Sequence, residues 1–95
     1  MLADHGGRII GKNIEIGRGE IDLHVMFGSL SVAVEVKALI APDPRAANPL
    51  RSYTAEKADQ VHRLARRLRP RPQRVDVIAV VLHAGGDDVR WVRAA

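Results

Sequence analysis

The sequence predicts a single α/β domain in which one helix flanks a mixed β-sheet. Residues 20–37 alternate apolar and polar side chains around a Gly-Ser turn, as a β-hairpin does. Residues 55–69 repeat apolar side chains every three or four positions, which indicates an amphipathic helix. Residues 74–83, "RVDVIAVVLH", are almost continuously apolar and β-branched, which is typical of a central strand buried on both faces.

Length and composition exclude several classes of protein. The 95 residues carry a net charge of +4 and no cysteine, so a disulfide framework and a thiolate zinc site are excluded. No apolar run is long enough to span a membrane, and the first ten residues, "MLADHGGRII", lack the layout of a signal peptide. We therefore expect a cytoplasmic protein with no membrane partner.

The N-terminal half contains the other strand and turn signals. Residues 8–16 predict a strand, with Gly11 as a bulge or bend, and "GRG" at 17–19 predicts a turn. Residues 38–53 hold three prolines and no periodicity, which predicts a long flexible loop.

The C-terminal half has clearer boundaries. Thr54 is a suitable N-cap for the helix over 55–69, and "PRP" at 70–72 ends it because proline lacks an amide hydrogen. "GGDD" at 85–88 predicts a turn, and residues 89–94 predict a final strand.

The Gly28-Ser29 turn fixes the register of the predicted hairpin. Glycine followed by serine suits a two-residue type II′ turn, so facing residues have numbers that sum to 57. One face is then entirely apolar, with the pairs Phe27/Leu30, Val25/Val32, Leu23/Val34 and Ile21/Val36. The other face carries the pairs Asp22/Glu35, Glu20/Lys37, His24/Ala33 and Met26/Ser31.

The facing carboxylates of Asp22 and Glu35 need an explanation, because opposed like charges destabilise a sheet. A shared proton, a cationic neighbour or a divalent metal ion would offset the repulsion. Mg²⁺ is typically held by one or two carboxylates together with water and substrate phosphate. The alternative is an exposed sheet face on which Glu20 and Lys37 form an ordinary cross-strand ion pair.

Arginines are concentrated around the predicted helix. Six of the chain's 12 arginines lie within 12 residues: Arg63, Arg66, Arg67, Arg69, Arg71 and Arg74. Such a basic run favours contact with a polyanion such as nucleic acid. The alternative is that the arginines only solvate one face of the helix.

The other polar candidates have simpler interpretations. Of the four histidines (His5, His24, His62 and His83), His24 shares a face with Asp22 and is a candidate supporting group, although an ordinary hydrogen-bonded histidine is the commoner case. Asp76 is expected to support Arg74 or to cap an edge, without a catalytic role. Trp91 is expected to pack near the end of the hairpin.

The order of motifs resembles that of the PD-(D/E)xK nucleases, which have the restriction-endonuclease-like fold. More narrowly, "GRGEIDL", "VAVEVK", "TAEKADQVHRLARRL" and "RVDVIAV" resemble the YraN-like family of small bacterial proteins, which is similar in fold to archaeal Holliday junction resolvases. The resemblance extends over about residues 2–93. It implies one nuclease-like domain over residues 1–95 that hydrolyses phosphodiester bonds, with branched DNA as a candidate substrate.

The resemblance also implies roles for individual residues. Asp22 and Glu35 would bind Mg²⁺ or Mn²⁺, and Lys37 would be the catalytic lysine. Glu20, Lys57 and Gln60 would support them, although Gln60 is displaced because "KADQ" stands where the family usually has "KQ". The residues expected to contact nucleic acid, DNA in preference to RNA, are Arg18, Arg63, Arg66, Arg67 and Arg69.

The start of the chain departs from the family pattern. Family members begin with a further helix that carries a glutamate, whereas "MLADHGG" matches only the end of that helix. The uncovered apolar face then predicts a homodimer. A protein that binds nucleic acid without cutting it, and a structural dimer with a degenerate site, are the alternatives to a nuclease.

Overall fold

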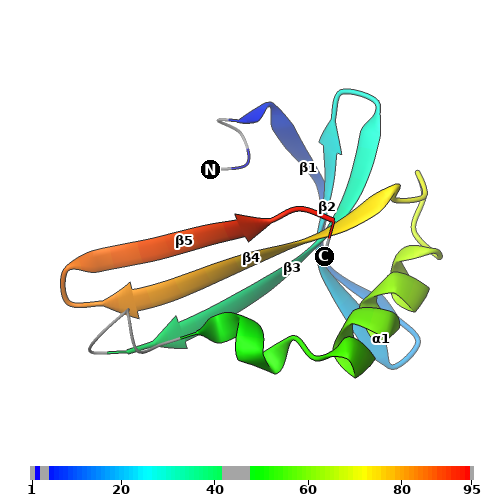
Figure 1. Ribbon diagram of the computed structural model, residues 1–95. Coiled ribbons are helices and arrows are strands. Elements are labelled where there is room, and N and C mark those ends of the chain that lie inside the picture. Colours follow the sequence, from blue (N-terminus) through cyan, green and yellow to red (C-terminus); the bar gives the residue numbers. More distant parts are fainter. Residues whose placement is uncertain (1, 3–4, 42–47, 95) are drawn as a thin grey trace.

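The computed structural model describes residues 2, 5–41 and 48–94, which form a five-stranded sheet and one α-helix (Figure 1). The elements in chain order are β1 (Gly7–Ile16), β2 (Gly19–Phe27), β3 (Leu30–Ile40), the 3₁₀ helix η3 (Pro49–Ser52), α1 (Ala55–Ala65), β4 (Arg74–His83) and β5 (Gly86–Val92). In these residues no helix has both the length and the apolar character needed to cross a membrane. The α/β class expected from the sequence is therefore correct.

The sheet is mixed and follows the order of the chain. Neighbouring strands pair in the order β1-β2-β3-β4-β5, antiparallel except for the parallel pair β3–β4. Parallel neighbours require a crossover, and here it contains η3 and α1. The helix therefore covers one face of the sheet.

Two clusters of buried side chains lie on the sheet. The cluster that includes helix residues contains Ile16, Ile21, Ala33, Val61, Ala65, Leu68 and Val75. The second contains Leu2, Val25, Val32, Val34 and Ile78, with Phe27 and Trp91 packed against it. β4 is buried along most of its length, as its apolar run predicts.

The hairpin turn and its register agree with the sequence. Gly28 has φ +61°, the positive value that the first position of a type II′ turn requires. The pairs from Phe27/Leu30 to Leu23/Val34 are those predicted. The register of β1 against β2 shifts between Ile9 and Gly11, where the sequence predicts a bulge.

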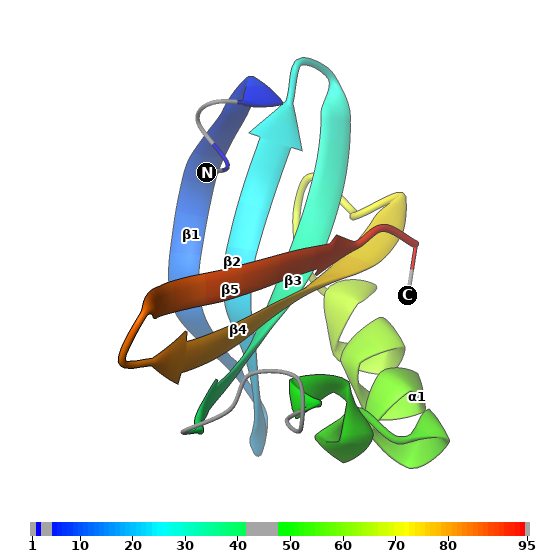
Figure 2. The same cartoon turned by 60° about the vertical axis from the view of Figure 1, so that its left-hand side comes forward.

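Beyond Leu23 and Val34 the paired register of β2 and β3 ends, while β3 remains paired with β4 as far as Ile40 and Leu82. β1 and β2 run across the direction of β4 and β5 in Figure 2. Ile21 therefore packs in the cluster with α1 and does not face Val36 as predicted. The sheet splits at the position of the predicted carboxylate pair.

Three predicted boundaries are wrong. β3 extends through residues 38–40, which the sequence placed in the loop, because these residues pair with β4; the part of that loop over residues 42–47 lies outside the described residues. α1 ends at Ala65, and the Arg67 and Leu68 amides bond the carbonyls three residues back, as in a tightened last turn. β5 begins at Gly86, so Asp87 and Asp88 belong to the strand.

Candidate active site

A cavity of about 530 Å³ lies where β2 and β3 separate, beside α1. We call it the acidic cavity; it is lined by Glu15, Gly17, Arg18, Gly19, Glu20, Asp22, Glu35, Lys57, Gln60, Val61 and Leu64. Six residues that the sequence singled out therefore lie around one space. Four carboxylates and two cationic side chains give its lining a negative formal charge in a protein whose net charge is positive.

Asp22 stands at the split in the sheet. Its Oδ2 atom accepts a hydrogen bond of 2.8 Å from the backbone amide of Val36. The hydrogen bonds between β2 and β3 have ended at this point, and the Asp22 side chain accepts from an amide of β3 that has no partner on β2. Backbone amides of a folded protein seldom remain unpaired. This contact fixes the carboxylate of β2 against β3, next to Glu35.

Glu35 is almost fully buried, with an exposed fraction of 6 %. Burial raises the pKa of its carboxyl group, and the charge of Asp22 raises it further; the Lys37 hydrogen bond and the charges of Lys37 and Lys57 oppose the shift. The Nζ atom of Lys37 lies 3.2 Å from Oε1 of Glu35. The three residues predicted to be catalytic are thus in electrostatic contact.

Glu20 has a different neighbour from the one predicted. It pairs across the β1–β2 ladder with Glu15, not with Lys37, because β2 has left β3 at this point. Lys37 forms its ion pair with Glu35 instead. The alternative prediction, that Glu20 and Lys37 form an ordinary cross-strand ion pair, is therefore wrong. Glu15 and Glu20 instead add two carboxylates to the lining of the acidic cavity.

The helix supplies the other wall. Thr54 caps α1 by accepting a hydrogen bond of 3.2 Å from the amide of Lys57, which sets the first turn beside the cavity. A Cβ atom added to Gly19 would lie 2.5 Å from a methyl carbon of Leu64. Glycine at this position therefore permits the close approach of β2 to α1 that brings Lys57 and Gln60 to the cavity.

The arginines expected to contact nucleic acid fall into separate groups. Arg18 lines the acidic cavity, and Arg63 lines an adjoining hollow of about 450 Å³ that shares Lys57 and Gln60 with it. A guanidinium nitrogen of Arg67 lies 3.6 Å from the Cβ position of Gly17, also at the cavity.

The remaining two arginines lie elsewhere. Arg66 lines a different hollow at the start of β4. Arg69 donates hydrogen bonds of 2.9 and 2.8 Å to the carbonyls of Arg66 and Leu68, so its guanidinium closes the end of the helix. The arginines of the run therefore do not all line one hollow.

Tyr53 is a neighbour of the site that the sequence analysis missed, because it lay in the predicted loop. Burial raises the pKa of its hydroxyl, and so does the charge of Glu35. Within the described part of the chain the buried hydroxyl has no hydrogen-bond partner. The one available signal was its place directly before the N-cap Thr54, where apolar side chains often pack back against the helix.

His24 does not support Asp22. Its Nε2 atom lies 2.8 Å from the hydroxyl of Ser31, which donates to the carbonyl of Pro70. Burial lowers the pKa of this histidine, and the interaction with the Pro70 backbone partly opposes that effect. His24 is thus a buried, hydrogen-bonded histidine, the alternative that the sequence favoured.

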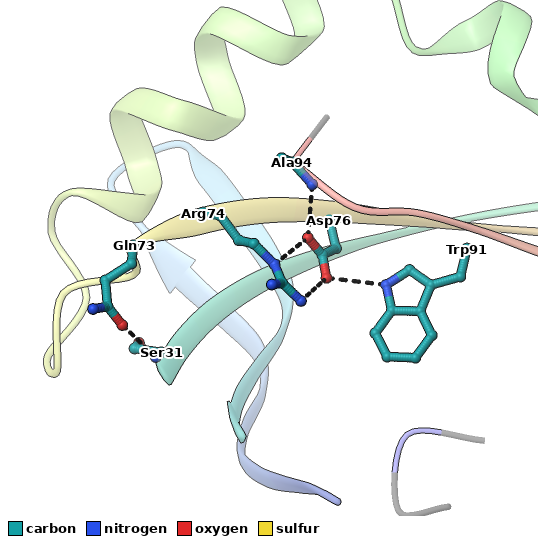
Figure 3. A network of polar contacts seen from close by, with 6 residues as sticks. All are labelled: Ser31, Gln73, Arg74, Asp76, Trp91 and Ala94. Carbon is teal, nitrogen blue, oxygen red and sulfur yellow. Dashed lines mark hydrogen bonds and ion pairs between the residues drawn. The ribbon is translucent and has the colours of Figure 1, made fainter. Parts of the chain in front are cut away.

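Asp76 and Trp91 form a network at the start of β4, separate from the acidic cavity (Figure 3). Asp76 accepts hydrogen bonds from Arg74, from the indole of Trp91 and from the backbone of Ala94. The expected partnership of Asp76 with Arg74 is therefore present.

The donor set of the acidic cavity suits a hard divalent cation. Carboxylate oxygens and water are the ligands that Mg²⁺ and Mn²⁺ prefer. Over residues 2, 5–41 and 48–94, no group of three or more histidine, cysteine or acidic side chains converges closely enough to hold a metal ion by itself. An ion at Asp22 and Glu35 would take its other ligands from water and substrate.

Comparison with known proteins identifies the family. Residues 1–80 match the family described as "Uncharacterised protein family UPF0102". A UPF0102 protein of Leifsonia xyli subsp. xyli is 38 % identical over 86 residues, an alignment that spans 84 % of this chain and 71 % of the relative. UPF0102 is the YraN-like group that the sequence motifs resemble. The chain belongs to the UPF0102 family.

Proposed function

We propose that the protein is a metal-dependent endonuclease of the restriction-endonuclease-like fold that hydrolyses phosphodiester bonds at the acidic cavity. The observation that carries the proposal is the convergence of Asp22, Glu35 and Lys37 at the split between β2 and β3. A buried carboxylate with a raised pKa that lines a cavity is a candidate for function. The mixed sheet with its flanking helix is consistent with this fold.

Each side chain has a chemical task in the proposed reaction. Asp22 and Glu35 would hold a Mg²⁺ or Mn²⁺ ion, whose chemistry there would be polarisation of the scissile phosphate and activation of water. Lys37, held by Glu35, orients the attacking water and offsets negative charge that develops on the phosphate oxygens. Bond cleavage leaves a 5′-phosphate and a 3′-hydroxyl, in analogy with the fold class.

Lys57 and Gln60 support the same site from α1. They line both the acidic cavity and the adjoining hollow of Arg63, so they can contact the phosphate next to the scissile one. Arg18 lines the acidic cavity at the β1–β2 turn, and the Arg67 guanidinium approaches the same turn at Gly17. Cationic groups around an acidic centre suit a nucleic-acid strand that passes over it.

Calorimetric titration with Mn²⁺ tests the metal site. Wild-type protein should bind Mn²⁺ weakly without substrate, and Asp22→Asn should abolish that binding because it removes one of two carboxylate ligands. Asp59→Asn is the matched control, since Asp59 is exposed on α1 and does not line the acidic cavity. Equal Mn²⁺ binding by wild type and Asp22→Asn would contradict the assigned site.

Cleavage of branched or flapped DNA tests the chemistry. We expect slow cleavage that is faster with Mn²⁺ than with Mg²⁺ and is lost in Glu35→Gln and in Lys37→Ala. Metal-dependent cleavage that survives both substitutions would show that other residues carry the reaction. Salt-dependent DNA binding without metal binding would instead favour the non-catalytic alternative.

A homodimer is the second part of the proposal. Four exposed apolar side chains lie on the sheet face away from α1, as the alternation along the strands requires. They are Val36, Ile40, Leu82 and Val89, with exposed fractions of 37 %, 80 %, 36 % and 48 %. Pairing of two such faces would remove apolar surface from water. A weak dimer has a dissociation constant of roughly micromolar size, so light scattering at tens of micromolar protein should report a dimer. Ile40→Lys should shift the protein toward a monomer. A wild-type monomer under these conditions would exclude the dimer.

A further inference from the structure

The hydroxyl of Tyr53 is a buried polar group beside the acidic cavity that the proposed reaction does not use. No hydrogen-bond partner for its oxygen exists among the described residues. We propose that Tyr53 is a positioning residue: its hydroxyl donates a hydrogen bond to the carboxylate of Glu35, directly or through one water molecule, and so orients that carboxylate toward the divalent cation. The orientation toward a cation rests on the proposed function, whereas the contact between the two side chains stands without it.

The ring of Tyr53 lies on the sheet face that carries Glu35. It packs against the cluster of buried side chains that contains Ala33 and Val61. Ala33 and Glu35 are two residues apart on β3, so their side chains point to the same face. Val61 also lines the acidic cavity. In Figure 2, η3 and α1 lie on the same side of the sheet. The phenol is therefore held on the helix side of the sheet, next to a side chain of the cavity lining.

The backbone around Tyr53 is fixed by hydrogen bonds on both sides. Its amide donates to the carbonyl of Leu50 at 3.0 Å, which closes η3. The side chain of Asn48 caps the other end of η3 by accepting from the Leu50 amide at 3.1 Å. Thr54, the next residue, caps α1. Tyr53 thus stands between two capped helices, and its ring is presented from a backbone with few alternative conformations.

The chemistry of the two groups is complementary. A buried donor without an acceptor is unfavourable, so buried hydroxyls nearly always have a partner. Burial raises the pKa of the Tyr53 hydroxyl, and so does the charge of Glu35; the phenol therefore keeps its proton at neutral pH and can donate it. Oε1 of Glu35 lies 3.2 Å from the Lys37 ammonium, and a carboxylate can accept further hydrogen bonds. Where two such groups do not touch, one water molecule can bridge them.

A donor on Glu35 would make the support of the two carboxylates similar. Asp22 is already fixed by the Val36 amide, at 2.8 Å. Glu35 is held by Lys37, a long side chain that is partly exposed, and the more rigid Tyr53 would complete its orientation. Groups that hold a metal ligand in place are worth about 10–100-fold in metal affinity. The carboxylate pair would then be oriented before a cation binds.

Carbon NMR of the tyrosine ring tests the contact in the metal-free protein. The chain has one tyrosine, so ¹³C labelling of the carbon that bears the hydroxyl gives a single signal. Loss of the acceptor in Glu35→Met should move this signal to lower chemical shift, toward that of a phenol without a partner. Ser52→Ala is the matched control, because it removes a neighbouring hydroxyl that binds the carbonyl of Pro49, and it should leave the signal in place.

Circular dichroism first establishes that each variant is folded. If Glu35→Met does not fold, Glu35→Gln takes its place. The amide of glutamine is a weaker acceptor than a carboxylate, so Glu35→Gln should move the carbon signal in the same direction by a smaller amount.

Calorimetric titration with Mn²⁺ tests the positioning role. Tyr53→Phe removes only the hydroxyl oxygen and should lower the Mn²⁺ affinity by about tenfold. Ser52→Ala should bind Mn²⁺ as the wild type does, since Ser52 does not line the acidic cavity. A phenol that only fills space would leave the Mn²⁺ affinity unchanged, because phenylalanine keeps the ring.

The two measurements separate the role of Tyr53 from the proposed nuclease activity. A carbon signal that stays in place in Glu35→Met and in Glu35→Gln would overturn the contact, whether or not the protein binds Mn²⁺. A shifted signal together with unchanged Mn²⁺ affinity in Tyr53→Phe would overturn the positioning role. A shifted signal in a protein that binds no Mn²⁺ would uphold the contact and reject the metal site of the proposed function.

Discussion

Asp76 and Glu35 are buried carboxylates on the adjacent strands β4 and β3, but their surroundings differ sharply. Asp76 accepts four hydrogen bonds and is completely buried. Glu35 forms an ion pair with Lys37 and lines the acidic cavity beside Asp22. A buried charge whose hydrogen bonds are saturated stabilises a fold, whereas one that lacks partners retains capacity for a ligand. The comparison predicts that substitutions at the two sites affect different properties.

The largest effect is expected from Asp76→Ala. The substitution leaves Arg74 without its carboxylate and removes the acceptor for Trp91 and Ala94. Loss of one member of a buried ion pair costs about 3–5 kcal/mol, and partial exposure of Arg74 places the expectation near the lower end. Urea unfolding measures the change. Asp88→Ala, at a more exposed carboxylate, should cost much less, and equal losses would contradict the comparison.

Gly19→Ala should have an intermediate effect. The new Cβ atom would lie 2.5 Å from Leu64, so α1 must move away from β2, at a cost of about 1–3 kcal/mol. Because this movement displaces Lys57 and Gln60, DNA binding should weaken as well. In Gly28→Ala the added carbon meets no atom within 4 Å, and only the positive φ opposes it. Gly28→Ala should therefore lose stability but retain DNA binding. If Gly19→Ala also retained DNA binding, the proposed role of Lys57 and Gln60 in contacting DNA would be contradicted.

The smallest effect on stability is expected from Glu35→Gln, and its sign depends on pH. Burial and the Asp22 charge raise the folded-state pKa of Glu35 above its ordinary value of 4.5. The folded protein therefore holds this proton more tightly than the unfolded chain, so the contribution to stability is present below pH 4.5 and is lost as pH rises through the raised pKa. Wild type should lose stability relative to Glu35→Gln over that range, in urea unfolding with a metal chelator. Parallel curves for the two proteins would contradict the expectation.

The hairpin was predictable because its information is local. Gly28 and Ser29 determine the turn, and the turn determines which residues of two alternating segments face each other. The ladder ends one pair before Asp22 and Glu35, and the hydrogen bond from the Val36 amide to Asp22 holds the two carboxylates near each other. Thr54 as helix cap and Gly11 as bulge are local signals of the same kind, and both are present in the structure.

The parts that could not be predicted depend on contacts between distant segments. The end of the β2–β3 ladder depends on β3 continuing along β4, and Glu20 changes its neighbour as a result. The sorting of the arginines depends on which side of α1 meets β2 or β4. The saturation of Asp76 requires the C-terminal residues Trp91 and Ala94.

The parallel pairing of β3 with β4 has a consequence for the order of folding. Hairpins with two-residue turns, such as β2–β3, close a short loop, whereas pairing of β3 with β4 must close a loop that contains η3 and α1. Pairing of β3 with β4 is expected to be the slower step, because the chain loses the entropy of the long loop before the stabilising contacts form. Asp22 and Glu35 are therefore expected to approach each other early, while Lys57, Gln60 and the partners of Asp76 arrive only with the crossover. During synthesis on the ribosome, Asp22 and Glu35 would be paired before α1, which encloses the acidic cavity, had been made.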